Sequence, residues 1–265
     1  MESIRVPLFT LPNQRQFSTS EDQWFKNCFP EQIDMPGTDK PVTHVVKRPG
    51  FSDSLTTATA AGRALYGWTE NGAIYAVVGN KIYKNGSDMG ATLDDATGRV
   101  DITEVKGGTP RLVLRVSDKI WTIAEDDTVT KMTDADIPTG LVSGIVNING
   151  YVFVLKGATN QIFHSDNNNP TAWDAGANIT SSLEPDLGVG IAKHLNYVVC
   201  FNEWSTEFFF DAGNASGSVL SPVEGIAMRY GCANGDTIFS GENTVVWMAQ
   251  GRTGGKSIMM LDGND

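Results

Sequence analysis

The feature that most constrains the fold is a β-hairpin pattern that returns along the chain. The stretch AIYAVVGNKIYKNG at 73–86 has two apolar runs, separated by Gly79-Asn80 and closed by Asn85-Gly86. These residue pairs tolerate the positive φ angles of tight turns, and the runs alternate with the period of a strand. Four more stretches follow the same plan, at 109–127, 149–168, 195–213 and 234–251. The chain is therefore predicted to be all-β.

The repeated hairpins have a regular spacing. The second strand of each carries an aromatic residue, and successive aromatics are 38, 42, 46 and 38 residues apart: Tyr83, Trp121, Phe163, Phe209 and Trp247. This spacing is close to the blade length of β-propellers, about 40 to 45 residues in the WD type. Weaker strand candidates would bring each unit towards the four strands of a blade: 98–105, 140–148, 177–183 and 188–195. We expect a β-propeller-like fold of repeated antiparallel blades.

The start of the blade region is ambiguous. The segment 56–68 is rich in Ala, which favours a helix, but Ala64, Tyr66 and Trp68 alternate as in a strand. Either element fits the sequence.

The blade region is predicted to span 56–265, with about five units of which the last is unfinished. Asp262-Gly263 has the composition of a hairpin turn, but no return strand follows it. We therefore expect the polypeptide to continue past Asp265. Five units leave open whether the ring closes within this chain.

Residues 1–55 form a different region, predicted to be an extended, Pro-rich docking arm. Six prolines interrupt any regular element: Pro7, Pro12, Pro30, Pro36, Pro41 and Pro49. Bulky residues lie among them, and such a segment packs either on its own propeller or on a neighbouring subunit. The residues predicted to lie in an interface are Trp24, Phe25, Phe29 and Pro30.

Composition excludes several classes of protein. The net charge is −11, from 31 acidic and 20 basic residues, so the basic face of a typical nucleic-acid binder is not expected and any contact with DNA should be loose. The sequence has no apolar run of membrane-spanning length and no signal-peptide pattern at its N-terminus. The cysteines Cys28, Cys200 and Cys232 are interpreted as inert core thiols.

No catalytic, cofactor or metal site is predicted. His44, His164 and His194 occur singly, without a metal-binding spacing. The Gly-Gly-Lys-Ser at 254–257 lacks the first Gly of a phosphate loop and is interpreted as a hairpin turn. The acidic residues that lie closest together in the sequence are interpreted as a solvated surface: Glu184, Asp186, Glu203, Glu207 and Asp211.

Two alternative functions stay open. SDNNNPTAW at 165–173 partly matches the Asp-box turn of sialidase-type propellers, although an Asn/Pro loop with local hydrogen bonds fits it better. With exposed aromatics such as Trp173 and Trp204, it supports a propeller that binds or cleaves carbohydrate on a host surface, through Glu184, Glu203 or Glu207. The other alternative is a propeller scaffold with partners unrelated to virions.

Several stretches also resemble a known family. DQWFKNCFPEQI at 22–33, VVKRPGF at 45–51, GNKIYKNGSDMG at 79–90 and GRV at 98–100 are similar to segments of the tail-nozzle, or packaged-DNA stabilisation, proteins of short-tailed bacteriophages. The most specific part runs from SDNNNPTAWDAG through PDLGVGIAKHLNYVVCFNEWSTEFFFDAG to GIAMRYGCANGD, with its motifs in the family's order.

The resemblance implies a structural, non-enzymatic role in the tail of a podovirus-like virion, assembled in the host cytoplasm. The subunit would dock under the head-to-tail adaptor as a ring, a homohexamer, beside other tail proteins such as the fibre or needle. It would extend the DNA channel and help to retain packaged DNA until ejection, making only loose, non-specific contact with the genome. Such a role needs no cofactor and no membrane.

Overall fold

The computed structural model describes residues 28–33, 42–47, 57–241 and 243–262. The chain divides into two compact units, residues 1–54 and residues 55–265, and each is described by itself. Within the described residues, no helix is long and apolar enough to cross a membrane.

The first unit contains a β-hairpin. Strand β1 (Cys28–Ile33) pairs antiparallel with β2 (Val42–Lys47), and Pro30 lies opposite Val45. A proline is tolerated here because each strand of a two-stranded sheet has one unpaired edge. The expectation that prolines exclude regular structure from residues 1–55 is therefore wrong for these two strands.

The described residues of the second unit form five antiparallel sheets that follow one another along the chain. In four of them the strands are hydrogen-bonded in chain order. The first has β3 (Gly62–Trp68), β4 (Ala73–Val78), β5 (Lys81–Lys84) and β6 (Ser87–Thr92). The second has β7 (Val100–Val105), β8 (Arg111–Val116), β9 (Lys119–Ala124) and β10 (Val129–Lys131). The third has β11 (Val146–Ile148), β12 (Tyr151–Lys156), β13 (Gln161–Asp166) and β14 (Asn169–Thr180), and the fourth has β15 (Gly188–His194), β16 (Tyr197–Asn202), β17 (Thr206–Asp211) and β18 (Leu220–Met228).

The fifth sheet differs from the others. Two short strands, β19 (Gly231–Cys232) and β20 (Phe239–Ser240), pair with one side of β21 (Thr244–Gln250), and β22 (Lys256–Asp262) pairs with its other side. A 3-10 turn at Gly235–Thr237 separates the two short strands. The sheet is thus three strands wide.

The fifth hairpin consequently lies one strand earlier in its sheet than the other four. Tyr83, Trp121, Phe163 and Phe209 lie on the third strands of their sheets, whereas Trp247 lies on β21, the second. Trp247 therefore has the same spacing in the sequence as the other four aromatics but a different position in its sheet. The predicted turn after residue 250 is confirmed, since it joins β21 to β22.

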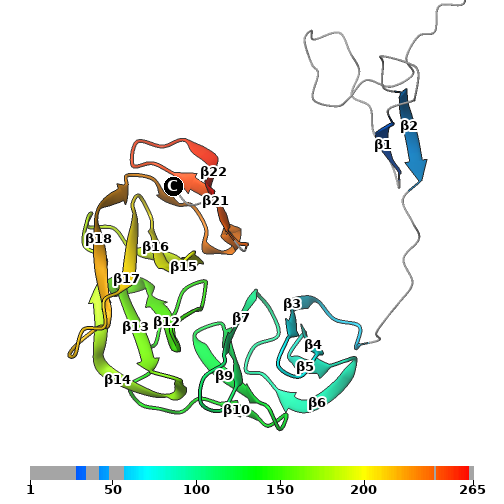
Figure 1. The fold of residues 1–265 in the computed structure, drawn as a ribbon, viewed down its shortest axis with the longest axis horizontal. Coiled ribbons are helices and arrows are strands. Elements are labelled where there is room, and N and C mark those ends of the chain that lie inside the picture. Colours follow the sequence, from blue (N-terminus) through cyan, green and yellow to red (C-terminus); the bar gives the residue numbers. More distant parts are fainter. Residues whose placement is uncertain (1–27, 34–41, 48–56, 242, 263–265) are drawn as a thin grey trace, which may run out of the picture. The chain divides into compact units, whose positions relative to one another are not determined.

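The five sheets form an arc that is open between the first and the fifth (Figure 1). The predicted propeller-like fold is confirmed, with a ring that does not close among the described residues. The segment 56–68 contains strand β3, so its helical interpretation is wrong.

The core lies between neighbouring sheets, with one apolar cluster for each neighbouring pair. On β8, Leu112 and Leu114 pack towards the first sheet, whereas Val113 between them packs towards the third. The middle strands are covered on both faces, so they are apolar at successive positions rather than at alternate ones. This explains the continuous apolar runs at the centre of each repeat.

Candidate functional site: an axial cavity and its arginine network

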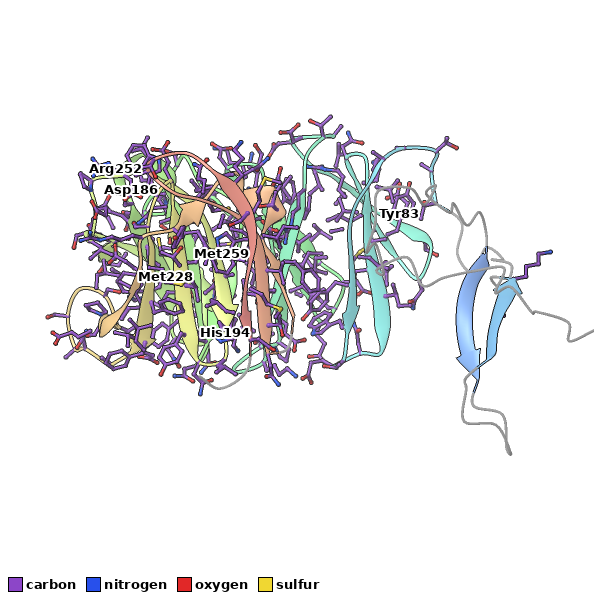
Figure 2. All side chains as sticks on the ribbon, turned by 90° about the horizontal axis from the view of Figure 1, so that it is seen from above. Tyr83, Asp186, His194, Met228, Arg252 and Met259 are labelled. Atoms are coloured by element: carbon purple, nitrogen blue, oxygen red, sulfur yellow. The ribbon has the colours of Figure 1, made fainter. Side chains whose placement is uncertain are left out.

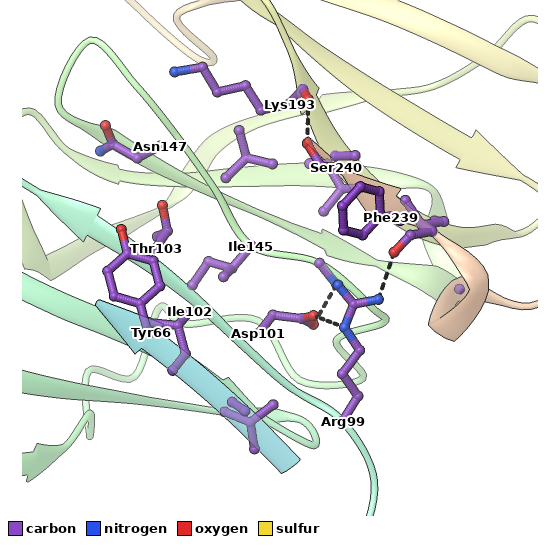
Figure 3. A pocket seen from close by; sticks show the side chains of 18 of the residues that line it. Tyr66, Arg99, Asp101, Ile102, Thr103, Ile145, Asn147, Lys193, Phe239 and Ser240 are labelled. Carbon is purple, nitrogen blue, oxygen red and sulfur yellow. Dashed lines mark hydrogen bonds and ion pairs between the residues drawn. The ribbon is translucent and has the colours of Figure 1, made fainter. Parts of the chain in front are cut away.

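The first strands of the five sheets surround a cavity of about 520 Å³. Each sheet contributes a polar side chain to its wall: Tyr66 from β3, Thr103 from β7, Asn147 from β11, Lys193 from β15 and Ser240 from β20 (Figure 3). The Ser240 hydroxyl donates to the carbonyl of Lys193 at 2.7 Å, which links the fourth and fifth sheets. The cavity is therefore built from residues distant in the sequence.

Tyr66 is a neutral donor on this wall. Burial, together with the carboxylate of Glu104, raises the pKa of Tyr66 to about 12. The phenol hydroxyl consequently keeps its proton throughout the neutral range.

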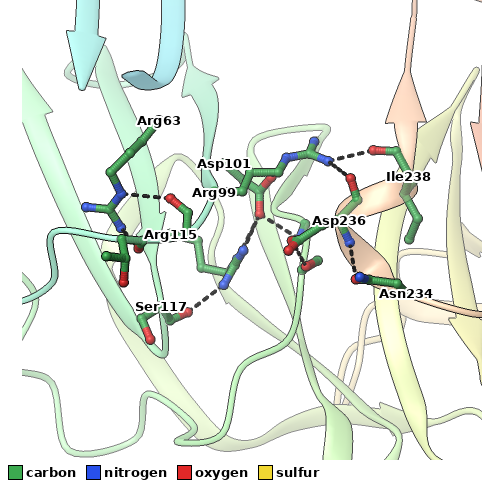
Figure 4. Close-up of polar contacts among 12 residues, drawn as sticks. Arg63, Arg99, Asp101, Arg115, Ser117, Asn234, Asp236 and Ile238 are labelled. Carbon is green, nitrogen blue, oxygen red and sulfur yellow. Dashed lines mark hydrogen bonds and ion pairs between the residues drawn. The ribbon is translucent and has the colours of Figure 1, made fainter. Parts of the chain in front are cut away.

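One end of the cavity is held by a carboxylate shared between two arginines. Arg115 donates from Nε and Nη2 to Oδ2 of Asp101 at 2.8 and 2.6 Å, and Arg99 lies with Nε 2.7 Å from Oδ1 (Figure 4). The backbone N–H of Gly144 donates to Oδ2 at 2.8 Å. Asp101 and Arg115 are both buried, so this charge pair depends on its hydrogen bonds to offset desolvation.

Arg99 and Arg63 extend the network through backbone carbonyls. Arg99 donates from Nη1 to the carbonyl of Ile238 at 2.7 Å, which connects the second sheet to the fifth. The buried Arg63 guanidinium donates to four carbonyls, at 2.5 to 3.0 Å: Gly79, Asp95, Thr97 and Gly98. These arginines thus fasten strands and loops together.

The arrangement fits a structural role better than a catalytic one. Two arginines line the wall, Arg63 and Arg99, and both are engaged by Asp101 or by carbonyls. Arg115, which does not line the cavity, is paired with Asp101. Among the residues that the structure describes, no group of three His, Cys, Asp or Glu side chains could hold a metal ion. The cavity has the volume of a small-molecule pocket, which is far too small for a DNA duplex.

The prediction of a solvated acidic surface is wrong for two of the five residues, Asp186 and Glu207. Asp186 is buried and accepts from Trp204 N at 2.7 Å and from the Ser205 hydroxyl at 3.1 Å. Glu207 is buried and accepts from Leu183 N at 2.8 Å and from the Ser181 hydroxyl. Donors supplied by the folded loop make the burial of these two carboxylates possible.

The other three members, Glu184, Glu203 and Asp211, are partly exposed. Glu184 lies near Arg229 and Arg252, at 3.7 and 3.5 Å. Asp211 instead accepts from Asn149 Nδ2 at 2.8 Å.

Asp186 and Glu207 are linked by a buried hydrogen-bond chain through Ser205, Asn202 and Ser181. Both carboxylates are thus engaged inside the fold, and neither lies on the wall of the axial cavity.

The aromatic residues suggested for glycan contact have different environments. Trp173 is buried between the second and third sheets and donates from Nε1 to the carbonyl of Pro170 at 3.0 Å. The prediction that Trp173 is exposed is therefore wrong, whereas Trp204 is partly exposed. Residues 169–173 lie on β14, so the segment predicted as an Asn/Pro loop is a turn at Asn167-Asn168 followed by a strand. The predicted local hydrogen bonding is present, since Asn169 Oδ1 accepts from the backbone N–H of Thr171 at 3.3 Å.

The predicted interface residues are only partly described. Trp24 and Phe25 lie outside the described residues. Phe29 and Pro30 lie on β1, opposite Val46 and Val45. Their role stays a prediction.

Two of the three cysteines lie in the core. Cys200 and Cys232 are buried and unbonded, and burial raises the pKa of each thiol. Both thiols are consequently unreactive, as predicted for core residues. Cys28 lies on β1.

Sequence reasoning missed the arginine network. The sequence feature that could have indicated it is Arg115, which lies inside the apolar run RLVLRV. An arginine inside a buried strand needs a hydrogen-bonding or charged partner. Asp101, on the neighbouring strand and directly opposite Arg115, is that partner.

These features define a β-propeller-type protein whose polar centre joins its sheets together. A family model described as "Bacteriophage P22 Gp10, beta-propeller" matches residues 39–265. The chain belongs to this family of phage stabilisation proteins, and it is thus a structural phage protein.

No curated protein matches the chain. Among solved structures, an inactive H270A virginiamycin B lyase from Staphylococcus aureus with quinupristin is 10% identical, with a TM-score of 0.49, and the match covers 90% of this chain and 75% of that one. A streptogramin B lyase is 13% identical, with a TM-score of 0.45 and coverage of 89% and 73%. Likenesses this weak say nothing about activity.

Proposed function

We propose that this protein is a nozzle subunit of a phage tail, which docks under the head-to-tail adaptor and forms part of the channel wall that retains packaged DNA. The match to the phage stabilisation family over residues 39–265 carries this proposal. A ring of sister copies, a homohexamer, would surround the genome, beside fibre or needle proteins.

The geometry supports a path for DNA outside the propeller axis. The axial cavity of about 520 Å³ has no room for a duplex. Its two arginines, Arg63 and Arg99, are already bonded to Asp101 or to carbonyls, so neither guanidinium is free to bind a phosphate. DNA would instead pass along an outer surface shared by several copies.

The net charge fits loose contact between this wall and the genome. At −11 the chain repels phosphates on average. A wall that does not grip the backbone lets the genome slide during ejection. The first unit, which includes Phe29 and Pro30 on β1, would supply the docking segment.

The carbohydrate alternative loses its main supports. Glu207 and Trp173 are buried, and Glu184 lies near two arginines.

Labelling of intact particles tests the proposal. Antibodies against the full chain, viewed by electron microscopy on purified particles, should mark the tail below the portal vertex. A control antibody against the major capsid protein should mark the head. Labelling confined to the head, or none on intact and disrupted particles, would contradict the proposal.

A further inference from the structure

A groove of about 500 Å³ lies at one end of the second unit, where the third and fourth sheets meet. Two aromatic rings, an aliphatic side chain, two amides and one carboxylate line it, and together these residues are called the aromatic groove: Asn149, Asn196, Tyr197, Phe210, Asp211 and Val223. Asn196 and Tyr197 follow closely after His194, the last residue of β15. Figure 2 shows His194 at the opposite end of the sheets from Asp186 and Arg252. The groove shares no lining residue with the axial cavity.

The carboxylate of Asp211 brings a negative charge to this groove. Its Oδ2 accepts from Asn149 Nδ2 at 2.8 Å, and its Oδ1 accepts from the backbone N–H of Gly213 at 3.0 Å. Both donors are neutral, so they orient the carboxylate without cancelling its charge. Within the part of the chain that the structure describes, no Lys or Arg forms an ion pair with Asp211, and none lines the groove. The charge is therefore available to a ligand.

Two aromatic side chains lie in the groove with this carboxylate. Tyr197 and Phe210 are directly opposite each other on β16 and β17, and Phe210 is 39% exposed. Tyr197 is partly exposed, and its buried part packs with Val223 against the core between the fourth and fifth sheets. The faces of aromatic rings attract cations through their quadrupole. A cation in the groove would thus be stabilised by a charge and by aromatic surface.

A filled example of this combination lies between the first and second sheets. Nζ of Lys84 lies 2.6 Å from each carboxylate oxygen of Asp127 and 5.9 Å from the centre of the Tyr75 ring. The Tyr75 hydroxyl donates to the same carboxylate at 3.1 Å. An aromatic ring beside a carboxylate therefore holds an ammonium group in this chain. The aromatic groove presents the same two kinds of group, but no lysine of the described chain occupies it.

The existing hydrogen bonds of the groove favour an ammonium over a guanidinium. Each oxygen of Asp211 already accepts one N–H, so a planar guanidinium would have to share both oxygens with the present donors. An ammonium is a compact charge that needs one free lone pair of Asp211, and the amide oxygens of Asn149 and Asn196 are further acceptors in the groove. An anion fits poorly, because the groove has no basic residue and the chain carries a net charge of −11.

We propose that the aromatic groove binds the primary ammonium group of an alkylamine, with Asp211 as its counterion and with Tyr197 and Phe210 as its aromatic contacts. A free polyamine and a lysine side chain of another protein present this same group. The site is a property of the purified chain and does not rest on the role in the tail. The two proposals can therefore fail separately.

Titration of the purified full chain with spermidine tests the site. The NMR signals of the Gly213 N–H and of the Asn149 side-chain amide report on Asp211, and they should shift in a saturable manner. A neutral alkanediol of similar length should leave both signals unchanged at the same concentrations. No saturable shift with spermidine, or equal shifts with the alkanediol, would overturn the proposal.

Matched variants locate the binding. Asp211→Asn removes the charge and should weaken spermidine binding roughly tenfold. Asp174→Asn is the control, because Asp174 is an exposed residue outside the groove, stands in the same Asp-Ala-Gly sequence and accepts from the N–H of Gly176 at 2.7 Å. The control should bind as the wild type does. Equal weakening in both variants would indicate a diffuse effect of charge and would overturn the site.

A second variant tests the aromatic contact without changing the carboxylate. Phe210→Leu keeps an apolar side chain but removes the aromatic face, so spermidine binding should weaken about two- to fivefold. Wild-type melting temperatures for this variant and for Asp211→Asn would show that the fold is retained. Unchanged binding in Phe210→Leu would contradict the assigned aromatic contact.

Other ligands distinguish the source of the amine and the class of ligand. N-acetyl-lysine amide presents the ammonium group as a protein does. If it binds as tightly as spermidine and loses binding in Asp211→Asn, the groove is assigned to a lysine of a partner; if only spermidine does so, the groove is assigned to free polyamines. Saturable shifts with glucose, lost in Asp211→Asn and not produced by spermidine, would replace the amine with a saccharide.

Discussion

Arg99 and Ile238 lie 139 residues apart, yet Nη1 of Arg99 donates to the carbonyl of Ile238 at 2.7 Å. This bond crosses from the second sheet to the fifth, between elements that share no strand pairing. Since Arg99 also pairs with Asp101, which accepts from Gly144, one short network fastens three of the five sheets at the centre of the arc.

Removal of the shared carboxylate should be severely destabilising. Asp101→Asn leaves Arg115 buried without its counterion, so we expect unfolding to become easier by about 3 to 5 kcal/mol. Urea unfolding followed by tryptophan fluorescence measures the loss. The double variant Asp101→Leu with Arg115→Met should recover much of it, because no buried charge is left alone; a double variant as unstable as the single one would contradict this explanation.

Packing between sheets should matter more than exposed apolar surface. Leu114 is fully buried between the first and second sheets, whereas Leu65 on β3 is 74% exposed. Leu114→Ala should cost about 2 to 5 kcal/mol and Leu65→Ala less than about 0.5 kcal/mol. Equal losses in denaturant unfolding would argue against a core located between the sheets.

The buried carboxylate of Glu207 should stabilise the loop that contains Leu183. Glu207→Gln weakens two accepted hydrogen bonds, and we expect a loss of about 1 to 3 kcal/mol. Hydrogen exchange at Leu183 N should become faster. Glu224→Gln, at an exposed position, is the control and should change neither quantity.

Tyr66 should make stability depend on pH in the alkaline range. Its pKa is raised from 10.0 to about 12 in the folded chain. The unfolded chain releases this proton first, so the stabilising contribution is complete below pH 10 and is lost as pH rises towards 12. In the Tyr66→Phe variant, the free energy of unfolding should therefore fall less between pH 10 and pH 12 than it does in the wild type. Urea unfolding at a series of pH values measures this. The same pH dependence in both proteins would contradict the raised pKa of Tyr66.

The N-terminal unit should be needed for attachment to the particle. Deletion of residues 1–33 removes β1 and all four predicted interface residues, and we expect particles that lack the subunit or lose DNA. The double variant Trp24→Ala with Phe25→Ala tests the side chains alone. Nuclease sensitivity of the genome in purified particles gives the measurement, and full protection in both variants would remove the docking role.

Much of the fold could be predicted because apolar runs and turn pairs are local signals. The strands predicted at 98–105 and 188–195 are present as β7 and β15. Strands β6 and β10 were missed because SDMGAT and VTK are polar and lie at sheet edges, where no apolar pattern is required.

The site was harder to predict than the fold because its bonds connect distant segments. Arg99 and Ile238 have no local pattern that relates them. Asp186 and Glu207 are buried because loop N–H and hydroxyl groups happen to face them, and the sequence does not show where such donors will lie. The sequence also does not show that the fifth hairpin lies one strand earlier in its sheet than the others. This shift arises because β19 and β20 together occupy a single strand position beside β21.

The proposal that the subunit lines the tail channel, with DNA outside the propeller axis, is tested most directly by the position of the genome in the tail. Electron cryomicroscopy of intact particles should resolve several copies of this chain in the tail, with duplex density along their outer surfaces and none in the axial cavity. Duplex density through the propeller axis, or a tail without this chain, would contradict the account.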